Sequence, residues 1–164
     1  MIEEVCDSDG VLRLTLNDPA TRNSLSEAML AALAGTLAAA RDNPAVRVII
    51  LAAYGPVFCA GHNLKEMTAA RTDPQNGGDR GQAYFTRVMG QCSRLMASFS
   101  AHPKPIIAEV AATATAAGCQ LVASCDLALA AEEASFATPG VHIGLFCSTP
   151  MVALSRKVAA KHAM

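Results

Sequence analysis

The chain has 164 residues, of which 52% are hydrophobic, 4% aromatic and 16% charged, and its formal net charge at pH 7 is −1. A chain of this length is expected to form one domain, residues 1–164, and to bury roughly 70% of the surface that its unfolded form exposes. The scattered Lys and Arg residues exclude a nucleic-acid-binding stripe, and no apolar run reaches the ~18 residues of a membrane span. Because the start "MIEEVCDSDG" is acidic, unlike a signal or transit peptide, we expect a cytoplasmic protein.

The six cysteines lie mostly in apolar segments and show no paired CxxC spacing: Cys6, Cys59, Cys92, Cys119, Cys125 and Cys147. Buried reduced thiols therefore explain them better than disulfides or a zinc site. Cys59 and His62 would chelate a metal ion only with two further ligands, which the sequence does not offer nearby. We expect no metal site.

The first third of the chain predicts a hairpin, a helix and a strand. Ile2–Cys6 and Val11–Leu16 flank the turn "DSDG", which is typical of a β-hairpin. Ser24, with Glu27 three residues later, has the spacing of a capping box and predicts a helix start. Apolar residues then recur at helical spacing until "RDNP", at Leu30, Leu33, Leu37 and Ala40. Residues 46–52 form a continuous apolar run that predicts a buried strand.

The remaining two thirds of the chain also alternate between predicted helices and strands. Residues 68–80, "TAARTDPQNGGDR", have the composition of a mobile loop that covers a site. Gln82–Ser100 predicts a helix whose apolar face carries Phe85, Val88, Met89, Cys92, Leu95, Met96 and Phe99. Further strands are expected at Ile106–Val110, Leu127–Ala130 and 135–136, and a helix at 150–164. This alternation predicts an α/β fold.

Two strand-to-helix junctions, around Gly61 and Gly118, are built from small residues. Small residues let another group approach the backbone, and a helix N-terminus favours negative charge. Two free amides that converge on one point form an oxyanion hole. Spacing does not show that they converge, and composition by itself favours the simpler alternative of two tight turns.

The segments "FCAGHNLKEM" and "AAGCQLVASCDLALAAEEASFATPGVHIGL" resemble the enoyl-CoA hydratase/isomerase, or crotonase, family, and the resemblance runs from "LNDPATRNSL" to the end of the chain. It implies a ClpP-like spiral of ββα units that binds an acyl-CoA thioester, with coenzyme A as part of the substrate and no separate cofactor. It also implies a homo-oligomer, a trimer or hexamer. The chain stops at "KVAAKHAM", where relatives continue through C-terminal helices, so we expect a fragment or a truncated member with exposed apolar surface.

By position, the resemblance assigns the backbone amides of His62 and Ala117 to the oxyanion hole. The ring of His62 is then a wall of the pocket rather than a base. The residues matching the segment that lines the CoA pantetheine and adenine are Ala60, Asn63, Leu64 and Lys65, with Arg22 a candidate for the CoA phosphates. Asn63 stands where many relatives have Asp, which affects the local hydrogen bonding.

The two catalytic glutamate positions of the family correspond to Gln120 and Gly140, neither of which exchanges a proton at neutral pH. One positioned acid or base is worth about 10² to 10⁴ in rate, so we expect no ordinary hydratase activity. One alternative is another acyl-CoA isomerase, decarboxylase or hydrolase that uses His142 or Ser148, although a pocket-lining histidine and a helix-capping serine are simpler interpretations. A second alternative is a non-catalytic acyl-CoA-binding or assembly subunit. The simplest interpretations of the other polar candidates are structural: a buried filler for Cys119, a salt-bridged strand residue for Glu109 and a structural carboxylate for Asp126.

Overall fold

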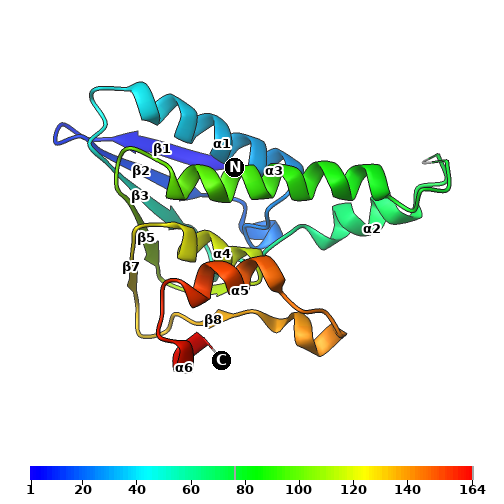
Figure 1. The fold of residues 1–164 in the computed structure, drawn as a ribbon. Coiled ribbons are helices and arrows are strands. Elements are labelled where there is room, and N and C mark those ends of the chain that lie inside the picture. The colour runs from blue at the N-terminus through cyan, green and yellow to red at the C-terminus, as the bar shows by residue number, and fades with distance from the viewer. Residues whose placement is uncertain (76, 164) are drawn as a thin grey trace.

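The computed structural model describes residues 1–75 and 77–163, and its strands form two sheets (Figure 1). The larger sheet has the order β1-β2-β3-β5-β7, with bounds Ile2–Cys6, Val11–Leu16, Val48–Ala53, Ile106–Val110 and Leu127–Ala130. β1 and β2 are antiparallel, and all other neighbours in this sheet are parallel. The smaller sheet is parallel, with the order β4-β6-β8 and the bounds Val57–Cys59, Thr113–Thr115 and Phe136–Ala137.

The chain passes repeatedly from the larger sheet to the smaller one and then into a helix. The pairs β3 and β4, β5 and β6, and β7 and β8 each place one strand in each sheet before the next helix begins. The α-helices are α1 Glu27–Asp42, α2 Leu64–Thr72, α3 Gln82–Ser100, α4 Ala117–Ser124, α5 Ser148–Ser155 and α6 Ala160–Ala163. Two short 3-10 helices, η1 and η2, span Pro19–Thr21 and Pro139–Ile143. This is the predicted spiral of ββα units.

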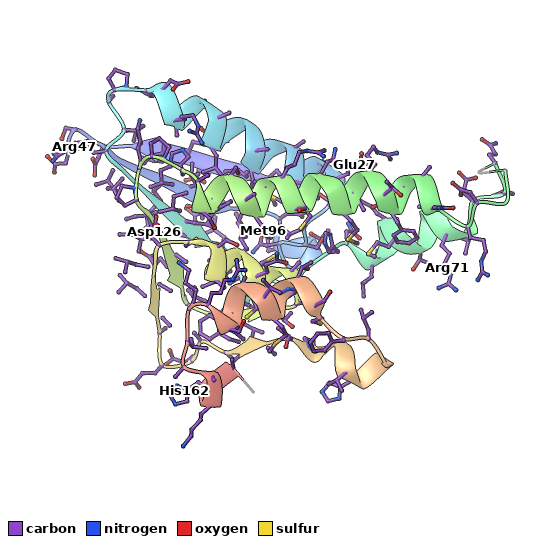
Figure 2. All side chains as sticks on the ribbon, in the orientation of Figure 1. Glu27, Arg47, Arg71, Met96, Asp126 and His162 are labelled. Atoms are coloured by element: carbon purple, nitrogen blue, oxygen red, sulfur yellow. The ribbon has the colours of Figure 1, made fainter. Side chains whose placement is uncertain are left out.

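The core lies between the larger sheet and helices α1, α3 and α4. β2 turns alternate residues inward, so Leu12, Leu14 and Leu16 are buried. Their partners on the parallel strands are equally apolar: Leu14 pairs with Leu51, and Leu51 pairs with Ala108. Figure 2 shows Met96 of α3 directed toward α4, where the Ser124 hydroxyl donates to its sulfur at 3.6 Å. The packing fixes α4, which carries the second of the two junctions.

The structure confirms the strongest periodic predictions. The hairpin strands, the helix Gln82–Ser100 and the strands Ile106–Val110 and Leu127–Ala130 have the expected bounds. On the apolar face of α3, the buried residues are Val88, Cys92, Leu95, Met96 and Phe99, whereas Met89 is 40% exposed. The buried part of this face therefore runs from Val88 to Phe99, and the N-terminal end of the helix is less buried.

The predicted start of the first helix and the predicted bounds of the strand after it were wrong. The capping box of Ser24 and Glu27 does not form, because α1 begins at Glu27 and its cap is Ser26, whose hydroxyl oxygen accepts from the Met29 amide at 3.0 Å. The strand expected at 46–52 runs instead from Val48 to Ala53, since Val46 lies in the preceding turn.

The later boundaries also shift. The predicted loop 68–80 begins only after Thr72, because α2 continues to that residue. Asn76 lies outside the described residues. The mobility of the loop stays a prediction. The strand expected at 135–136 lies at Phe136–Ala137. The helix expected at 150–164 is two helices, α5 and α6, because the chain turns after Ser155; Met164 lies outside the described residues. β6 was not predicted at all.

All six cysteines are free thiols, and Cys59, Cys92, Cys119 and Cys125 are buried as predicted. Burial raises the pKa of the Cys59 and Cys125 thiols to about 12 and that of Cys92 to about 11. Cys6 is exposed and Cys147 is partly exposed, so the prediction of burial was wrong for these two.

The C-terminal third leaves an apolar face open to solvent. Its most exposed large residues are Leu127, Leu129, Phe136, Val141, Leu145, Phe146 and Val152. This confirms the exposed apolar surface expected there. Among the residues that the structure describes, every helix falls short of the length and hydropathy that crossing a bilayer demands.

Candidate functional site: two touching strand-to-helix turns

The first turn leads from β4 into α2 and is tied to residues that precede α1. The Ala60 amide donates to the carbonyl of Arg22 at 3.1 Å, and the Gly61 carbonyl accepts from the Leu25 amide at 2.7 Å. Gly61 has a φ of +85°, a conformation that costs glycine little. Asn63 then caps α2, its side-chain oxygen accepting from the Lys65 amide at 3.0 Å. The turn is therefore held at both ends.

Asn23 is a positioning residue that the sequence analysis missed. It is fully buried with a φ of +52°, a left-handed conformation that asparagine tolerates better than most residues. Its side-chain amide donates to the carbonyls of Tyr54 and Val57 at 2.8 and 2.9 Å, and its side-chain oxygen accepts from the Asp18 amide at 2.8 Å. Asn23 thus fixes the segment against which the first turn is bonded. The only sequence signal is an asparagine in the polar stretch "DPATRNS".

The second turn leads from β6 into α4 through Ala116. This alanine has a φ of +53° and a ψ of −122°, which is a backbone conformation normally reserved for glycine. Its amide donates to the Ala137 carbonyl at 2.8 Å, and its carbonyl accepts from the Gln120 amide at 3.1 Å. Such a residue costs on the order of 1–3 kcal/mol, and residues of this kind cluster at functional sites.

The two turns touch. A Cβ atom built on Gly61 would lie 3.0 Å from the Ala116 Cβ and 3.2 Å from the Ala117 backbone nitrogen. A Cβ atom built on Gly118 would collide with the Cys59 carbonyl oxygen, so the start of α4 packs directly on the end of β4. Glycine is therefore required at both positions, and the two turns are in contact.

Each turn carries a backbone amide without a partner. Neither the His62 amide nor the Ala117 amide donates a hydrogen bond to any residue within the described part of the chain. The Ala117 amide also belongs to the N-terminus of α4, where the helix dipole is positive. Two such donors on touching turns suit an oxygen atom that gains negative charge.

The ring of His62 lies beside these amides. Its Nδ1 atom is covered by protein and lacks a hydrogen-bond partner. Burial lowers the pKa of His62, and a weaker backbone interaction with Leu25 opposes this shift. The ring is therefore neutral at pH 7.

Gln120 and Ser148 line one cavity. The cavity has a volume of about 370 Å³ and lies between α3, α4 and α5; its other lining residues include Met96, Ser124, Val152, Arg156 and Lys157. Gln120 is 9% exposed and stands one turn after Ala117 on α4. Ser148 is exposed as the first residue of α5, whose cap residue is Cys147 with no side-chain bond, so the helix-cap interpretation of Ser148 was wrong.

Gly140 and His142 lie together on η2. A Cβ atom on Gly140 would lie 2.6 Å from both the Leu145 carbonyl oxygen and the Cys147 sulfur, so a side chain does not fit there without movement. His142 is exposed, and none of the hydrogen bonds among the described residues joins its ring to either turn. The structure thus groups Ala60, His62 and Ala117, and it leaves His142 outside that group.

The proposed CoA-contacting residues surround the first turn. Ala60 and Asn63 are partly buried within it, whereas Leu64 is 71% exposed and Lys65 is also exposed at the start of α2. Arg22 is exposed and joined to the turn through its carbonyl. All five residues are near one another along this turn.

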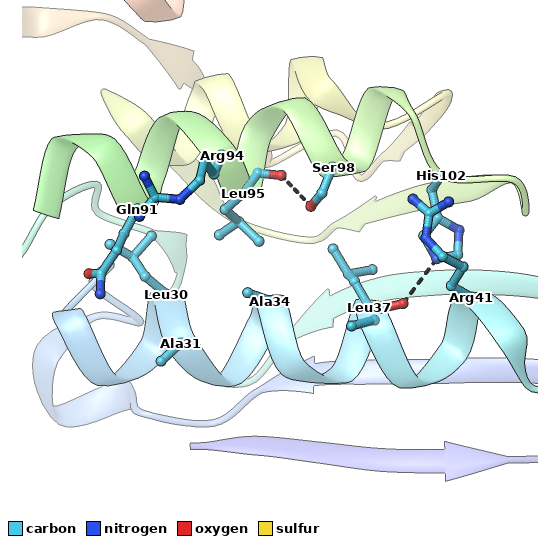
Figure 3. Close-up of a pocket in the computed structure, with 11 residues that line it drawn as sticks. Leu30, Ala31, Ala34, Leu37, Arg41, Gln91, Arg94, Leu95, Ser98 and His102 are labelled. Atoms are coloured by element: carbon cyan, nitrogen blue, oxygen red, sulfur yellow. Dashed lines mark hydrogen bonds between the residues drawn. The ribbon is translucent and has the colours of Figure 1, made fainter. Parts of the chain in front are cut away.

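A second cavity of about 370 Å³ lies elsewhere, between α1 and α3 (Figure 3). Its lining includes Leu30, Ala34, Arg41, Gln91 and His102, and none of the turn residues. In it, Nε2 of His102 lies 3.1 Å from the Leu37 carbonyl oxygen, and the Ser98 hydroxyl donates to the Leu95 carbonyl at 2.7 Å. The His102 contact joins the end of α3 to α1, whereas the Ser98 hydrogen bond lies within α3.

Three other polar candidates have the predicted structural roles. Arg13 donates two hydrogen bonds to Glu109, at 2.9 and 2.7 Å, and these lower the pKa of that carboxyl. Asp126 accepts from the Ile106 amide at 2.8 Å and so joins two strands. Burial raises the pKa of the Cys119 thiol, which opposes a reactive thiolate. Within residues 1–75 and 77–163, no three His, Cys, Asp or Glu side chains are placed to hold a metal ion.

A spiral of ββα units whose two strand-to-helix turns are in contact is the crotonase fold. The sequence model of the enoyl-CoA hydratase/isomerase family matches residues 7–164. The chain therefore belongs to the enoyl-CoA hydratase/isomerase family.

Several relatives are similar over nearly the whole chain. Enoyl-CoA hydratase domain-containing protein 3, mitochondrial, of Xenopus laevis is 50% identical over 155 residues, which are 94% of this chain and 50% of that protein. The crystal structure of the human protein of that name is 46% identical, with a TM-score of 0.85 over 99% of this chain and 60% of that one. The 2,3-dehydroadipyl-CoA hydratase of Escherichia coli is 35% identical over 135 residues, 82% of this chain and 48% of that protein.

The motifs "GHNLKE", "ATAAGCQLVASCD" and "SFATPGVHIGLFCSTP" resemble the branch named for domain-containing protein 3, and the comparisons confirm that resemblance. The chain spans about half the length of the curated relatives that it matches.

Proposed function

We propose that the protein binds an acyl-CoA thioester and polarises its carbonyl oxygen with the amides of His62 and Ala117. The observation that carries this proposal is the pair of unpaired amides on two touching turns. Both donors are fixed before a ligand arrives, because Asn63 and the segment at Arg22 hold the first turn and the Ala137 carbonyl holds the second. Such preorganised donors stabilise an oxyanion or enolate with little reorganisation.

The coenzyme A part of the substrate runs along the first turn in this proposal. Arg22 and Lys65 are exposed cations on either side of it and pair with phosphates, while Ala60 and Leu64 offer apolar contact to the pantetheine. Asn63 replaces the usual Asp without loss of the cap, since one side-chain oxygen accepts from both the Lys65 and the Glu66 amides. No separate cofactor is required.

Ordinary hydration is not part of the proposal. Gln120 does not exchange protons at neutral pH, and Gly140 lies where even a methyl group meets the Leu145 carbonyl. Loss of one positioned acid or base costs about 10² to 10⁴ in rate. One relative is named a hydratase and another, from Arabidopsis thaliana, a dienoyl-CoA isomerase, so the family's names cover more than one reaction.

The second candidate function is a non-catalytic acyl-CoA-binding or assembly subunit. The crowding at Gly140 favours it, because the position of one catalytic carboxylate is closed. An isomerase, decarboxylase or hydrolase that uses His142 or Ser148 has less support, since both residues are exposed and His142 is not bonded to the turns.

Titration calorimetry with butyryl-CoA and with free coenzyme A tests the proposal. We expect butyryl-CoA to bind more tightly, because its carbonyl adds two amide hydrogen bonds. Ala117→Pro removes one donor at the first position of α4, where proline suits a helix. It should erase the advantage of butyryl-CoA over free coenzyme A while circular dichroism stays unchanged. Equal affinities for the two ligands in the unaltered protein would contradict the oxyanion-hole role.

The apolar face of the C-terminal third supports a homo-oligomer, a trimer or hexamer as in the family. Val141, Leu145 and Phe146 are 74%, 57% and 74% exposed. Burying side chains of this size contributes roughly 1.5–3 kcal/mol each. Light scattering that finds a monomer at micromolar concentration would contradict this part of the proposal.

From the sequence, we also propose that residues 1–164 form one core domain. We propose in addition that the protein is located in the cytoplasm. The vertebrate relatives are named mitochondrial, so location is open to a direct test. Fluorescence of a C-terminal fusion in the producing cell distinguishes the two compartments.

A further inference from the structure

The cavity between α1 and α3 is separate from the two turns and has the size and floor of a small-molecule site (Figure 3). Its volume of about 370 Å³ lies within the range of ligand pockets, roughly 300–1,000 Å³. The buried side chains of Leu30, Leu37 and Leu95 form an apolar floor. Midway along the α1 side the lining residue is Ala34, whose small methyl group leaves the space open. The cavity therefore suits an apolar chain.

Two arginines, Arg41 and Arg94, line this cavity, and neither is paired with a carboxylate. The ion pairs that the described part of the chain contains use other arginines. Within the same part of the chain, the Arg94 side chain makes no hydrogen bond, and Arg41 makes one long bond, to the Ala101 carbonyl at 3.4 Å. None of the described residues that line the cavity is Asp or Glu. Both guanidinium groups are thus available to bind an anion.

The two guanidinium groups lie toward opposite ends of the cavity. Figure 3 shows Arg94 directed toward Gln91 at one end and Arg41 beside His102 at the other. A Cβ atom built on Gly90 would lie 3.4 Å from Arg94 Nη1, which agrees with a side chain that turns toward the start of α3. Along α1, the rise from Leu30 to Arg41 is about 16 Å at 1.5 Å per residue. An apolar span therefore separates two positive charges.

The other polar side chains at these ends differ in what they can offer a ligand. The Lys104 amide donates to His102 Nδ1 at 3.2 Å, so the ring hydrogen is on Nε2, which donates to the Leu37 carbonyl at 3.1 Å. Both ring nitrogens are used, and His102 is a wall of the cavity. The Gln91 side-chain oxygen, in contrast, is buried without a partner. Because no hydrogen bond holds that oxygen, the amide group can rotate and present its NH₂ group to an anion bound by Arg94.

We propose that the cavity between α1 and α3 binds an apolar chain with a carboxylate at each end, an α,ω-dicarboxylate. One carboxylate pairs with Arg94 and the Gln91 amide group, the other pairs with Arg41, and the chain lies over the three leucines. The planar guanidinium group matches a carboxylate with two parallel hydrogen bonds. A chain with a single carboxylate would leave one arginine unpaired, and a neutral chain would leave both. This site does not depend on the proposed function, because it shares no residue with the two turns.

Ligand-observed NMR with dodecanedioate measures binding at this cavity. We expect a dissociation constant of about 0.1–1 mM, as for a flexible ligand of this size in an open pocket. Dodecanoate, with one carboxylate, should bind about fivefold more weakly, and Arg41→Gln and Arg94→Gln should each weaken dodecanedioate binding by about the same factor. Arg47→Gln is the matched control, since Arg47 is an exposed arginine outside the cavity lining. It should leave the affinity unchanged.

Ala34→Leu tests the place of the chain. Leucine suits a helix, and its side chain would fill the middle of the cavity, so dodecanedioate binding should be lost while circular dichroism stays unchanged. If Ala34→Leu fails to fold, the arginine variants decide.

Three outcomes would overturn this inference. They are equal affinities for dodecanedioate and dodecanoate, unchanged binding in the protein that carries both arginine substitutions, and displacement of dodecanedioate by butyryl-CoA, which would place the ligand at the turns. Ala117→Pro separates the two proposals, because it should leave dodecanedioate binding intact even where it erases the advantage of butyryl-CoA over free coenzyme A.

Discussion

Replacing Gly61 with alanine should force the two turns apart. The new Cβ would lie 3.0 Å from the Ala116 Cβ and 3.2 Å from the Ala117 nitrogen, closer than most real contacts of this kind. The left-handed φ of +85° costs a non-glycine residue about 1–2 kcal/mol, and overpacking adds about 1–3 kcal/mol. We therefore expect Gly61→Ala to lower the free energy of unfolding by about 2–5 kcal/mol and to weaken acyl-CoA binding.

Gly144 supplies a matched control. Its φ of +71° is also left-handed, but an added Cβ would meet nothing within 4 Å. Gly144→Ala should therefore show only the backbone cost of about 1–2 kcal/mol. Urea unfolding of both variants measures the difference, which isolates the crowding between the turns. Equal losses of stability would refute the contact between Gly61 and the start of α4.

Three further outcomes follow from the same geometry. Ala116→Gly should raise the midpoint of urea unfolding. It releases backbone strain on the order of 1–3 kcal/mol in the folded state, whereas the added entropy of the unfolded chain costs only about 0.4–1 kcal/mol. A lower midpoint would argue against strain at Ala116. Gly140→Glu combined with Gln120→Glu should not create crotonyl-CoA hydration, since the Cβ at position 140 would lie 2.6 Å from the Leu145 carbonyl; efficient hydration in an absorbance assay would show that this segment yields. The Arg13 hydrogen bonds lower the pKa of Glu109, so the stability from this pair is complete above pH 4.5 and is lost as pH falls through the lowered pKa. Glu109→Gln should flatten that part of the unfolding profile below pH 4.5, and an unchanged acid limb would contradict it.

The bounds of a helix or strand are predicted best from the sequence where a long element keeps one hydrophobic period. α3 repeats its apolar face over 19 residues, and β5 is bounded by a proline before it and small residues after it, so both have the expected bounds. Short elements carry less signal: β6 has only three residues, Thr113–Thr115, and is defined by pairing with β4 and β8 rather than by its own pattern. At the start of α1, Ser24 has the spacing of a capping box, but Ser26 is the cap because its hydroxyl oxygen accepts from the Met29 amide, whereas the Ser24 hydroxyl is buried without a hydrogen-bond partner.

The site depended on contacts between distant segments. Spacing identified the amides near Gly61 and Gly118 but did not show that the turns touch, which required the registers of β4 and β6. The role of Asn23 was not visible, because its partners Tyr54 and Val57 lie more than thirty residues further along the chain. The strain at Ala116 was also hidden, since alanine in sequence gives no sign of a positive φ.

The carbonyl stretch of a bound acyl thioester tests the central claim most directly. Infrared difference spectra of butyryl-CoA, with and without a ¹³C label at the carbonyl, isolate that one bond in the complex. If the amides of His62 and Ala117 both donate to the oxygen, the band moves to lower wavenumber on binding, and Ala117→Pro reverses much of that shift. A bound ligand whose carbonyl band stays at its position in water, in the unaltered protein, would contradict the account.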